Sequence, residues 1–379
     1  MKKIVFDARM YGLEHAGIGR YIKNLLFQFS KIKPEFEFHL LVSAQRKKAV
    51  VYELGDYFTY HALKSGHYSF GEQSEVRKIL KRINPDMVHF PHFNAPFFYS
   101  GQHIVTIHDL IKHYFRGKAT TTRSAYGYWP KYLSYRLLVR EVIKRSKAII
   151  VPTHWWKKKL IQSYKLNEKK VFVTHEGIDQ AFLKKDHFSA EKKELIFKKY
   201  KLKKNNYFIY TGSLYPHKNL ERLIKAFLSL NKKNLTLVLV SARCVFSERL
   251  EKTIKSFGAD KQIKLLGFVP DNDLKILYSG SIALVQPSLM EGFWLAGLEA
   301  MASNCPVVCS EASCLPEVYQ KAVSYFNPLE ISDIARALKE VAEDSALRKK
   351  LLASGKKLIK IYSWEKTAKQ TIDIYRKFI

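Results

Sequence analysis

The stretch IALVQPSLMEGFWLAGLEAMA, residues 282–302, combines a predicted strand, a turn and the start of a helix. Its first seven residues form an apolar run typical of a buried strand, and a glycine-bearing turn leads from them into a helical pattern. Glu291 and Glu299 bracket this turn. N–H groups at a helix N-terminus favour a phosphate, and carboxylates accept hydrogen bonds from sugar hydroxyls. The pattern therefore suits a nucleotide-sugar site, unless Glu291 merely caps the turn and Glu299 is a solvated helix residue.

Short apolar, β-branched runs recur along the chain and predict strands. In the first half they are Lys3–Ala8, Phe38–Ser43, Asp86–Phe90, His103–His108, Ala148–Thr153 and Val171–Glu176. In the second half they are Tyr207–Ser213, Leu235–Ala242, Ile263–Phe268, Ile282–Ser288, Pro306–Ser310 and Val323–Phe326. Helical patterns lie between most of them, such as Ile22, Leu25, Leu26 and Phe29, or Leu220, Leu223, Ile224 and Phe227. This alternation predicts an α/β fold with parallel sheets covered on both faces.

The length of 379 residues exceeds what one hydrophobic core usually serves, so we expect two doubly wound, Rossmann-like domains. The lysine-rich segment Ala181–Asn206 carries no strand signal and follows the last strand of the first half. We therefore predict one domain at residues 1–185 and a second at 186–362.

The stretch EGFWLAGLEAMA resembles the E-x7-E signature of retaining glycosyltransferase family 4. Other stretches are similar to that family in the expected order: KIVFDARMYGLEHAGIGRYIKNLL, VTIHDL, YTGSLYPHKNLERLIKAF, LLGFVPDNDL and SWEKTA. The resemblance spans nearly the whole chain. It implies the GT-B fold, in which an acceptor-side domain and a nucleotide-sugar-binding domain face each other across a cleft. It also implies that the helix at 363–379 crosses back to the first domain.

The resemblance assigns residues of the first domain to the donor site. Gly17 and Gly19 of GIGRY would lie over the donor phosphates, although the third glycine of a dinucleotide fingerprint is replaced by Ile22. His108 would contact the donor or the acceptor near the transferred sugar, and Asp109 would orient His108 or contact the acceptor. A histidine in such a place is often only a structural hydrogen-bonding residue.

In the second domain, Lys218 would reach the diphosphate as a point charge. The family commonly has an arginine beside this lysine or earlier in the loop, whereas this chain has Ser213 and His217. A neutral His217 still donates a hydrogen bond, but the site loses a permanent positive charge. Either Lys218 carries most of the neutralisation or another cation, Arg243, contributes.

The resemblance assigns the sugar hydroxyls to Glu291 and the ribose to Glu299. The backbone of the turn Gly292, Phe293, Trp294 and Leu295 would face the phosphates and sugar, and Phe268 and Val269 would lie beside the base. Trp294 stands where the family usually has glycine, and Ala296 where it often has proline. A tryptophan would narrow the donor pocket or stack on a sugar, and we expect it to exclude a backbone conformation that only glycine tolerates.

The implied reaction is retaining transfer of a hexose without a bound metal or other cofactor, with His108, Lys218 and Glu291 as the catalytic residues. The motifs FDARM and GIGRY most resemble those of bacterial mannosyltransferases, so GDP-mannose is the first donor expected. UDP-glucose, UDP-galactose and UDP-N-acetylglucosamine follow. The acceptor expected is a polyprenyl-linked oligosaccharide or a lipopolysaccharide-type glycan. Phosphorylases, an epimerase and a degenerate site that binds a nucleotide sugar without turnover remain alternatives.

The chain is strongly basic, with 65 Lys and Arg against 34 Asp and Glu and a net charge of +31. Such a charge attracts anionic membranes, acidic glycans or nucleic acid, unless it reflects composition alone. The segment 112–147 interleaves basic residues, Lys118 and Arg123 among them, with tyrosines and Trp129. We expect it to contact an anionic membrane; the alternative is an ordinary helix with its aromatics in the core.

Several classes are disfavoured. No stretch approaches 18 uninterrupted apolar residues, and the N-terminus lacks the apolar run of a signal peptide. We therefore expect a cytoplasmic protein at the inner face of the plasma membrane. Cys244, Cys305, Cys309 and Cys314 lack CxxC spacing, so reduced thiols are expected rather than a zinc site. No motif indicates specific nucleic-acid binding.

Overall fold

The computed structural model describes residues 1–379 except residues 13, 14, 67, 68, 98, 118, 119, 122–124, 185–187, 243 and 244. Four residues that the sequence analysis singled out, Lys118, Arg123, Arg243 and Cys244, therefore lie outside the described residues. The contribution expected of Arg243 to the donor site stays a prediction.

The chain divides into two compact units. Unit 1 comprises Met1–His113, Arg123–Gly177 and Ser363–Ile379, and unit 2 comprises Tyr114–Thr122 and Ile178–Tyr362. The main boundary between the two units lies between Gly177 and Ile178. It is eight residues before the predicted boundary between residues 185 and 186. The reason is that Ile178 and Phe182 are buried in the core of unit 2.

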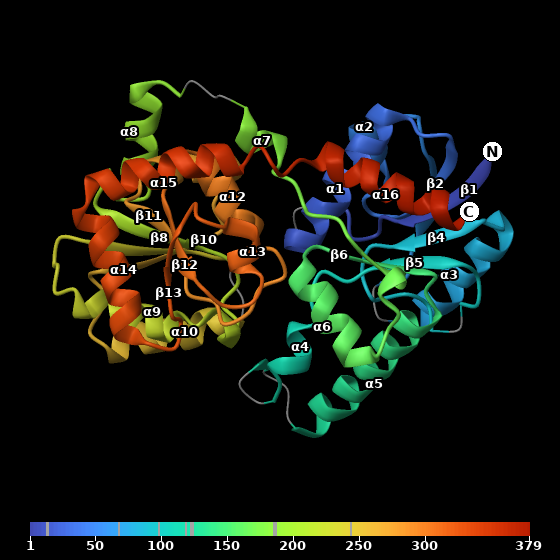
Figure 1. Ribbon diagram of the computed structural model, residues 1–379, viewed down its shortest axis with the longest axis horizontal. Helices are drawn as coiled ribbons and strands as arrows, with labels where there is room; N and C mark the ends of the chain where they lie inside the picture. The colour runs from blue at the N-terminus through green and yellow to red at the C-terminus, as the bar shows by residue number, and fades with distance from the viewer. Residues whose placement is uncertain are drawn as a thin grey trace. The chain divides into compact units, whose positions relative to one another are not determined.

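Unit 1 is built on a seven-stranded parallel sheet with the order β3-β2-β1-β4-β5-β6-β7 (Figure 1). Its strands are β1 (Lys2–Asp7), β2 (Phe36–Ser43), β3 (Thr59–Leu63), β4 (Met87–Phe90), β5 (His103–Thr106), β6 (Ala148–Val151) and β7 (Val171–Val173). The central strands are buried along their length, as expected for a parallel sheet covered on both faces.

Helices connect most of the successive strands of unit 1. They are α1 (Ala16–Ile32), α2 (Lys47–Leu54), α3 (Phe70–Ile83), α4 (Ile111–Tyr114), α5 (Ala125–Arg145), α6 (His154–Tyr164) and α16 (Trp364–Phe378), with the 3-10 turn η3 (Glu168–Lys170). α16 is in contact with α1, although more than 330 residues separate them (Figure 1). Tyr375 on α16 reaches the sheet, where its hydroxyl lies 2.5 Å from Nδ1 of His89 on β4.

Unit 2 contains a six-stranded parallel sheet with the order β10-β9-β8-β11-β12-β13. The strands are β8 (Tyr207–Thr211), β9 (Thr236–Val240), β10 (Ile263–Gly267), β11 (Ala283–Gln286), β12 (Val307–Ser310) and β13 (Ser324–Phe326). The helical elements are α7 (Gln180–Leu183), α8 (Ala190–Lys199), η4 (Pro216–Lys218), α9 (Leu220–Ser229), α10 (Val245–Ser256), α11 (Asp271–Gly280), α12 (Leu295–Ala302), α13 (Leu315–Tyr319), α14 (Ile331–Glu343) and α15 (Ser345–Leu358).

Alternate residues of the strands in unit 2 enter two separate cores. Tyr207 and Ile209 of β8 belong to a cluster with α11 and α12, whereas Phe208 and Tyr210 belong to a cluster with α9 and α14. This is the two-residue period of a strand with helices on both faces. The two parallel sheets confirm the predicted α/β class of two Rossmann-like units.

All twelve predicted strands are present, most of them one to three residues shorter at an end. The structure adds β3, a strand that the sequence analysis missed. Its sequence TYHAL has an edge position next to β2 and only Leu63 fully buried, so it lacks the apolar run on which the prediction relied. None of the helices in the described part of the chain is both long and apolar enough to cross a membrane.

Candidate functional site

The strand order of unit 2 reverses direction between β8 and β11. In open parallel sheets, ligands bind outside the carboxyl ends of the strands at such a switch point. Two loops leave the sheet here, residues 212–219 after β8 and residues 287–294 after β11. Most of the unit 2 residues that the sequence analysis assigned to the donor lie in these two loops.

Asn219 ties the two loops together. It adopts a left-handed backbone with φ 58°, and its side-chain amide donates to the carbonyl oxygens of Pro287 (3.0 Å) and Pro328 (2.7 Å). A second link is the backbone bond from Leu289 N–H to the His217 carbonyl, 2.8 Å long. These bonds fix η4, and with it the direction of Lys218, against the start of the β11 loop.

Lys218 and Glu291 form a buried ion pair. The Lys218 Nζ lies 2.7 Å and 2.8 Å from the two carboxylate oxygens of Glu291, and the side chains are only 12% and 6% exposed. The Gln286 amide also donates to Glu291 Oε1 at 2.6 Å. The sequence analysis assigned the lysine to the diphosphate and the glutamate to the sugar, and did not foresee that the two would pair. The Glu291 carboxylate thus binds the side chains of Lys218 and Gln286, and the alternative of a turn cap stays a prediction.

Three buried polar atoms near this pair have no hydrogen-bond partner among the described residues: Thr211 Oγ1, Gln286 Oε1 and Ser288 Oγ. Thr211 and Gln286 end β8 and β11, the two strands that flank the switch point. Buried hydroxyl and amide groups are normally satisfied, so such atoms point to an absent partner. The sequence analysis missed them; a glutamine at the end of the apolar run IALVQPS was the available signal.

Trp294 corrects one expectation. It adopts φ 69° and ψ 71°, the left-handed region that favours glycine, directly before α12. A tryptophan therefore does not exclude this conformation, although it costs about 1–2 kcal/mol for a residue with a Cβ. The indole is 8% exposed and packs 5.1 Å from the Tyr319 ring inside unit 2. Packing in the core is thus its observed role, and narrowing of the donor pocket or stacking on a sugar stays a prediction.

The other predicted residues of this turn are covered to different degrees. Gly292 and Leu295 are partly covered, and Phe293 is 3% exposed with its ring 5.4 Å from that of Tyr362. Glu299 lies on α12 and is 5% exposed, so the alternative of a solvated helix residue is wrong. The donor contacts assigned to these residues stay predictions.

His217 is neutral at pH 7. Burial lowers its pKa to about 4, and the neighbouring Lys218 charge acts in the same direction, while Glu291 opposes it. Its ring stacks on Tyr215 at 5.9 Å and lies 5.6 Å from Phe115. Lys218 is therefore the permanent positive charge in this described loop.

The remaining unit 2 predictions lie at the margins of this site. Ser213 is exposed, and its carbonyl accepts from the Tyr210 hydroxyl at 2.5 Å. Phe268, which follows β10, is 71% exposed, whereas Val269 is buried in the core. An exposed aromatic ring suits contact with a base, but that contact stays a prediction.

The glycines of the first loop have different surroundings. Gly17 lies in the first turn of α1, and a Cβ there would meet open space. Gly19 is buried, and a Cβ would collide with the Gly12 carbonyl of the loop after β1. Gly19 therefore has a packing reason to be glycine, whereas the exposed Gly17 is the one whose backbone is accessible.

His108 lies just after β5, and Glu176 rather than Asp109 orients it. Its Nδ1 is 2.9 Å from Glu176 Oε1, and its Nε2 is 3.0 Å from the Pro91 carbonyl. Asp109 accepts a bond from Ile111 N–H at 3.0 Å. Both ring nitrogens of His108 thus face acceptors, and its contact with a sugar stays a prediction.

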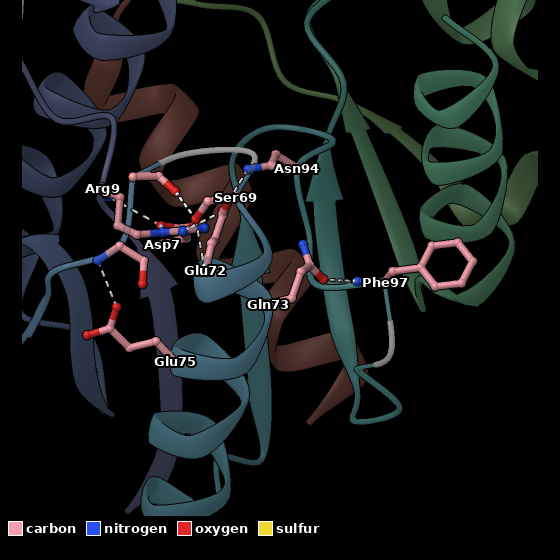
Figure 2. Close-up of polar contacts among 10 residues, drawn as sticks. Asp7, Arg9, Ser69, Glu72, Gln73, Glu75, Asn94 and Phe97 are labelled. Carbon is pink, nitrogen blue, oxygen red and sulfur yellow. Dashed lines mark hydrogen bonds and ion pairs between the residues drawn. The ribbon is translucent and has the colours of Figure 1, made fainter. Parts of the chain in front are cut away.

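A second charged cluster lies at the switch point of unit 1, between β1 and β4 (Figure 2). Arg9 donates to Asp7 from Nε (2.8 Å) and from NH2 (2.6 Å), and to Glu72 from NH1 (2.5 Å). Asn94 donates to the same Glu72 oxygen at 2.7 Å. Ser69 caps α3 by accepting from Glu72 N–H. The sequence analysis missed this cluster; the spacing Ser69-x-x-Glu72, typical of a capping box, was one signal.

Two families of known proteins match this chain, over ranges that contain the predicted site residues. Residues 15–182 match the family described as Glycosyltransferase Family 4, and residues 191–358 match the family described as Glycosyl transferases group 1. The matched ranges contain His108 in the first case and Lys218, Glu291 and Glu299 in the second.

Among individual proteins, the chain is similar to the O-antigen chain mannosyltransferase RfbU of Salmonella typhimurium. The two are 27% identical over 280 residues, which cover 73% of this chain and 70% of the relative. The chain is also 33% identical to O-antigen chain mannosyltransferase B of Escherichia coli over 184 residues, about half the length of each (48%). In structure it is similar to Anabaena HepE in complex with UDP and glucose, with a TM-score of 0.75, 17% identity and full coverage of both chains.

Proposed function

Because the chain belongs to glycosyltransferase family 4 and has the GT-B fold, we propose that it transfers mannose from GDP-mannose with retention at the anomeric carbon. The acceptor we propose is a lipid-linked or lipopolysaccharide-type glycan. Two similar proteins are O-antigen chain mannosyltransferases, which supports both the sugar and the acceptor class. UDP-hexoses are the second choice of donor.

One observation carries the proposal: the buried Lys218–Glu291 pair lies at the switch point of unit 2 beside Thr211, Gln286 and Ser288, whose polar atoms have no partner among the described residues. A nucleotide sugar supplies what these groups lack. Its hydroxyls and phosphate oxygens can bind hydroxyl and amide groups, and its diphosphate can bind the lysine.

The pair suggests how the donor is held. In the structure the Lys218 charge is matched by one carboxylate. A bound diphosphate competes for the ammonium group, which can hold both anions because it has three donors. Glu291 then accepts hydrogen bonds from sugar hydroxyls, and Glu299 is the candidate for the ribose.

The same lysine acts on the chemical step. The bond between the anomeric carbon and the diphosphate oxygen breaks, the acceptor hydroxyl bonds to the same face of the sugar, and its proton leaves with the phosphate. Negative charge grows on the departing diphosphate, where Lys218 and the backbone N–H groups before α12 stabilise it. His217, being neutral, contributes a hydrogen bond rather than a charge.

The test uses a panel of nucleotide sugars with the full-length protein. Thermal stabilisation by GDP-mannose and slow release of GDP are expected from the wild type. Glu291→Ala and Lys218→Ala should each nearly abolish transfer, because each removes a contact to the donor. Both variants should still fold. Lys225→Ala is the matched control, since Lys225 forms an exposed 2.7 Å pair with Glu221 in the same unit. Full activity in either site variant would contradict the proposal.

A non-catalytic protein that binds nucleotide sugars or anionic polymers is the second candidate. The departures at Ser213 and His217 favour it, because they leave the loop with fewer permanent charges. It predicts thermal stabilisation by a nucleotide sugar without any release of nucleotide in the presence of acceptor glycan. Release above the rate of the Glu291→Ala variant would exclude it.

We further propose that α5 contacts anionic lipid at the inner face of the plasma membrane. Four large apolar side chains recur along one face of this helix, and all are exposed: Tyr126 (94%), Trp129 (45%), Leu133 (59%) and Leu137 (57%). Exposed basic residues continue the same face toward the C-terminal end of the helix: Arg136, Arg140 and Lys144. Tyr132, in contrast, is buried, so part of the aromatic content of the segment is ordinary core.

Such a face, apolar at one end and basic at the other, suits insertion among anionic headgroups. The test is co-sedimentation with vesicles of phosphatidylcholine alone or mixed with phosphatidylglycerol. Binding should require the anionic lipid and should fall in the double variant Trp129→Ser/Leu133→Ser. Tyr52→Ser is the control, because Tyr52 is 91% exposed on α2. Equal binding by all three proteins would rule α5 out.

A further inference from the structure

The turn that carries Glu291 lies against a segment of the chain to which no role in the donor site has been assigned. This segment is residues 313–319, which lead into and include α13. Two non-glycine residues adopt a left-handed backbone conformation here: Trp294 in the turn (φ 69°) and Ser313 in the segment (φ 55°). Backbone outliers of this kind persist only where the surroundings hold them, and they cluster at functional sites.

Three side chains of the segment bind the backbone of the turn. Ser313 Oγ accepts from Glu291 N–H at 3.1 Å. The Cys314 thiol lies 3.3 Å from the Glu291 carbonyl and 3.2 Å from the Gly292 carbonyl. The Tyr319 hydroxyl donates to the Trp294 carbonyl. The turn is therefore held through its peptide groups, independently of the Glu291 side chain.

Burial keeps both acidic donors of the segment protonated. It raises the pKa of the Cys314 thiol and of the Tyr319 phenol well above their ordinary values, and the nearby Glu291 charge acts in the same direction on each. A protonated thiol and phenol can donate to carbonyl oxygens at any physiological pH.

The packing around Tyr319 explains a glycine inside α12. A Cβ on Gly297 would lie 2.5 Å from the Tyr319 hydroxyl and 2.6 Å from the Trp294 ring. Gly297 therefore leaves the space in which the Tyr319 ring and the Trp294 indole meet. On the other side, Tyr362 donates to the Val318 carbonyl at 2.8 Å and braces α13.

These bonds determine where the N–H groups of the turn point. In a trans peptide the carbonyl of one residue and the N–H of the next point in opposite directions. Holding the carbonyls of Glu291, Gly292 and Trp294 toward the segment 313–319 turns the N–H groups of the following residues the other way. Those are the groups of Gly292, Phe293 and Leu295, at the N-terminus of α12, where an anion is favoured.

We propose that Ser313, Cys314 and Tyr319 are positioning residues of the donor site, which hold the turn 291–294 so that its N–H groups face the diphosphate. The proposal rests on the proposed function, since it takes the ligand to be a nucleoside diphosphate. It assigns no contact between these three side chains and the ligand.

The variants that test it are Tyr319→Phe, which removes only the hydroxyl, and Cys314→Ala and Cys314→Ser, which remove and replace the thiol donor. Cys309→Ala is the matched control, because Cys309 on β12 is a thiol as fully buried as that of Cys314. Two quantities are measured: amide hydrogen exchange of residues 291–298 in the free protein, and the Kd of GDP and of UDP.

Loss of one buried hydrogen bond corresponds to about a tenfold change. In Tyr319→Phe we expect about tenfold faster exchange of the turn and about tenfold weaker nucleotide binding. Cys314→Ala should weaken binding about threefold, Cys314→Ser should restore it to within about twofold, and Cys309→Ala should change neither quantity. In the transfer reaction the KM for the donor should rise more than kcat falls.

Two results would overturn the proposal: exchange of the turn unchanged in Tyr319→Phe, or faster exchange with a nucleotide Kd within twofold of the wild type. A wild-type protein that binds neither GDP nor UDP would instead contradict the proposed function. The exchange measurement separates the two cases, because it needs no ligand.

Discussion

Each unit has a buried ionic cluster at the switch point of its sheet, and the two clusters differ in how completely they are satisfied. In unit 1 the Arg9 guanidinium, 2% exposed, donates to Asp7 and to Glu72, and Asn94 completes the set. In unit 2 Lys218 faces one carboxylate, and three buried polar atoms nearby have no partner among the described residues.

This difference indicates that the cluster in unit 1 stabilises the fold and that the cluster in unit 2 binds a ligand. The guanidinium fork binds carboxylates in two directions and ties the end of β1 to α3, and Glu72 in turn accepts from Asn94 in the loop after β4 (Figure 2). With only 2% of its side chain exposed, Arg9 is inaccessible to a ligand. An ammonium group on a flexible stem can shift between a carboxylate and a phosphate. We therefore expect substitutions in the first cluster to change stability and substitutions in the second to change donor binding.

The largest effect expected is on stability, from Arg9→Met. Removing one partner of a buried ion network leaves carboxylates uncompensated and typically costs about 3–5 kcal/mol. The free energy of unfolding, measured with urea, should fall by that amount. The Kd of GDP for the protein that remains folded should not change.

Arg336→Met is the control for Arg9→Met, because Arg336 pairs with Asp333 and Glu340 but is 47% exposed. Its effect should be below about 1 kcal/mol. A loss of GDP affinity in Arg9→Met at unchanged stability would reverse the roles given to the two clusters.

Gly297→Ala should have a smaller effect, which lowers both the free energy of unfolding and the affinity for GDP. The added methyl group would press on Tyr319 and Trp294, and overpacking of this sort costs about 1–3 kcal/mol. Because the displaced side chains hold the Glu291 turn, GDP affinity should fall together with the unfolding free energy. Ala300→Gly on the same helix is a comparison that loosens α12 without adding bulk; if both variants alter GDP affinity equally, the effect belongs to helix stability.

The smallest effect expected concerns pH and unit 1. Burial lowers the pKa of His89 to about 3, so folding favours its neutral form over the unfolded value of about 6.5. The stabilisation is present above pH 6.5 and is lost as the pH falls toward 3. Between pH 7 and pH 6 the loss should be about 0.5–1 kcal/mol. Unfolding midpoints at the two pH values should differ less in His89→Gln; an equal difference would assign the pH dependence to other groups.

Much of the fold could be predicted from the sequence, because buried parallel strands are continuous apolar runs. β3 escaped because an edge strand needs no such run. The candidate site was predictable as a set of residue types through resemblance, since Lys218, Glu291 and Glu299 lie in recognisable motifs. Their mutual geometry was not: pairing between residues 73 positions apart depends on Asn219 bridging two loops, which no local pattern encodes.

Trp294 shows the opposite limit. Its chemistry argued against a left-handed backbone, and tertiary contacts with Tyr319 and Gly297 override that local preference. The Arg9 cluster was missed because the spacing Ser69-x-x-Glu72 indicates only a helix cap, and no local pattern joins Glu72 to Arg9, 63 residues away.

The central claim is that Lys218 is held by Glu291 until a diphosphate engages it. The most direct measurement is the Kd of GDP, by calorimetry, for the wild type, Lys218→Ala and Glu291→Gln. Lys218→Ala should bind about 100-fold more weakly, as expected for loss of a buried charge contact of 2–5 kcal/mol. Glu291→Gln should bind GDP at least as tightly as the wild type, because its lysine is released, and yet fail to transfer the sugar. Unchanged GDP affinity in Lys218→Ala would contradict the account.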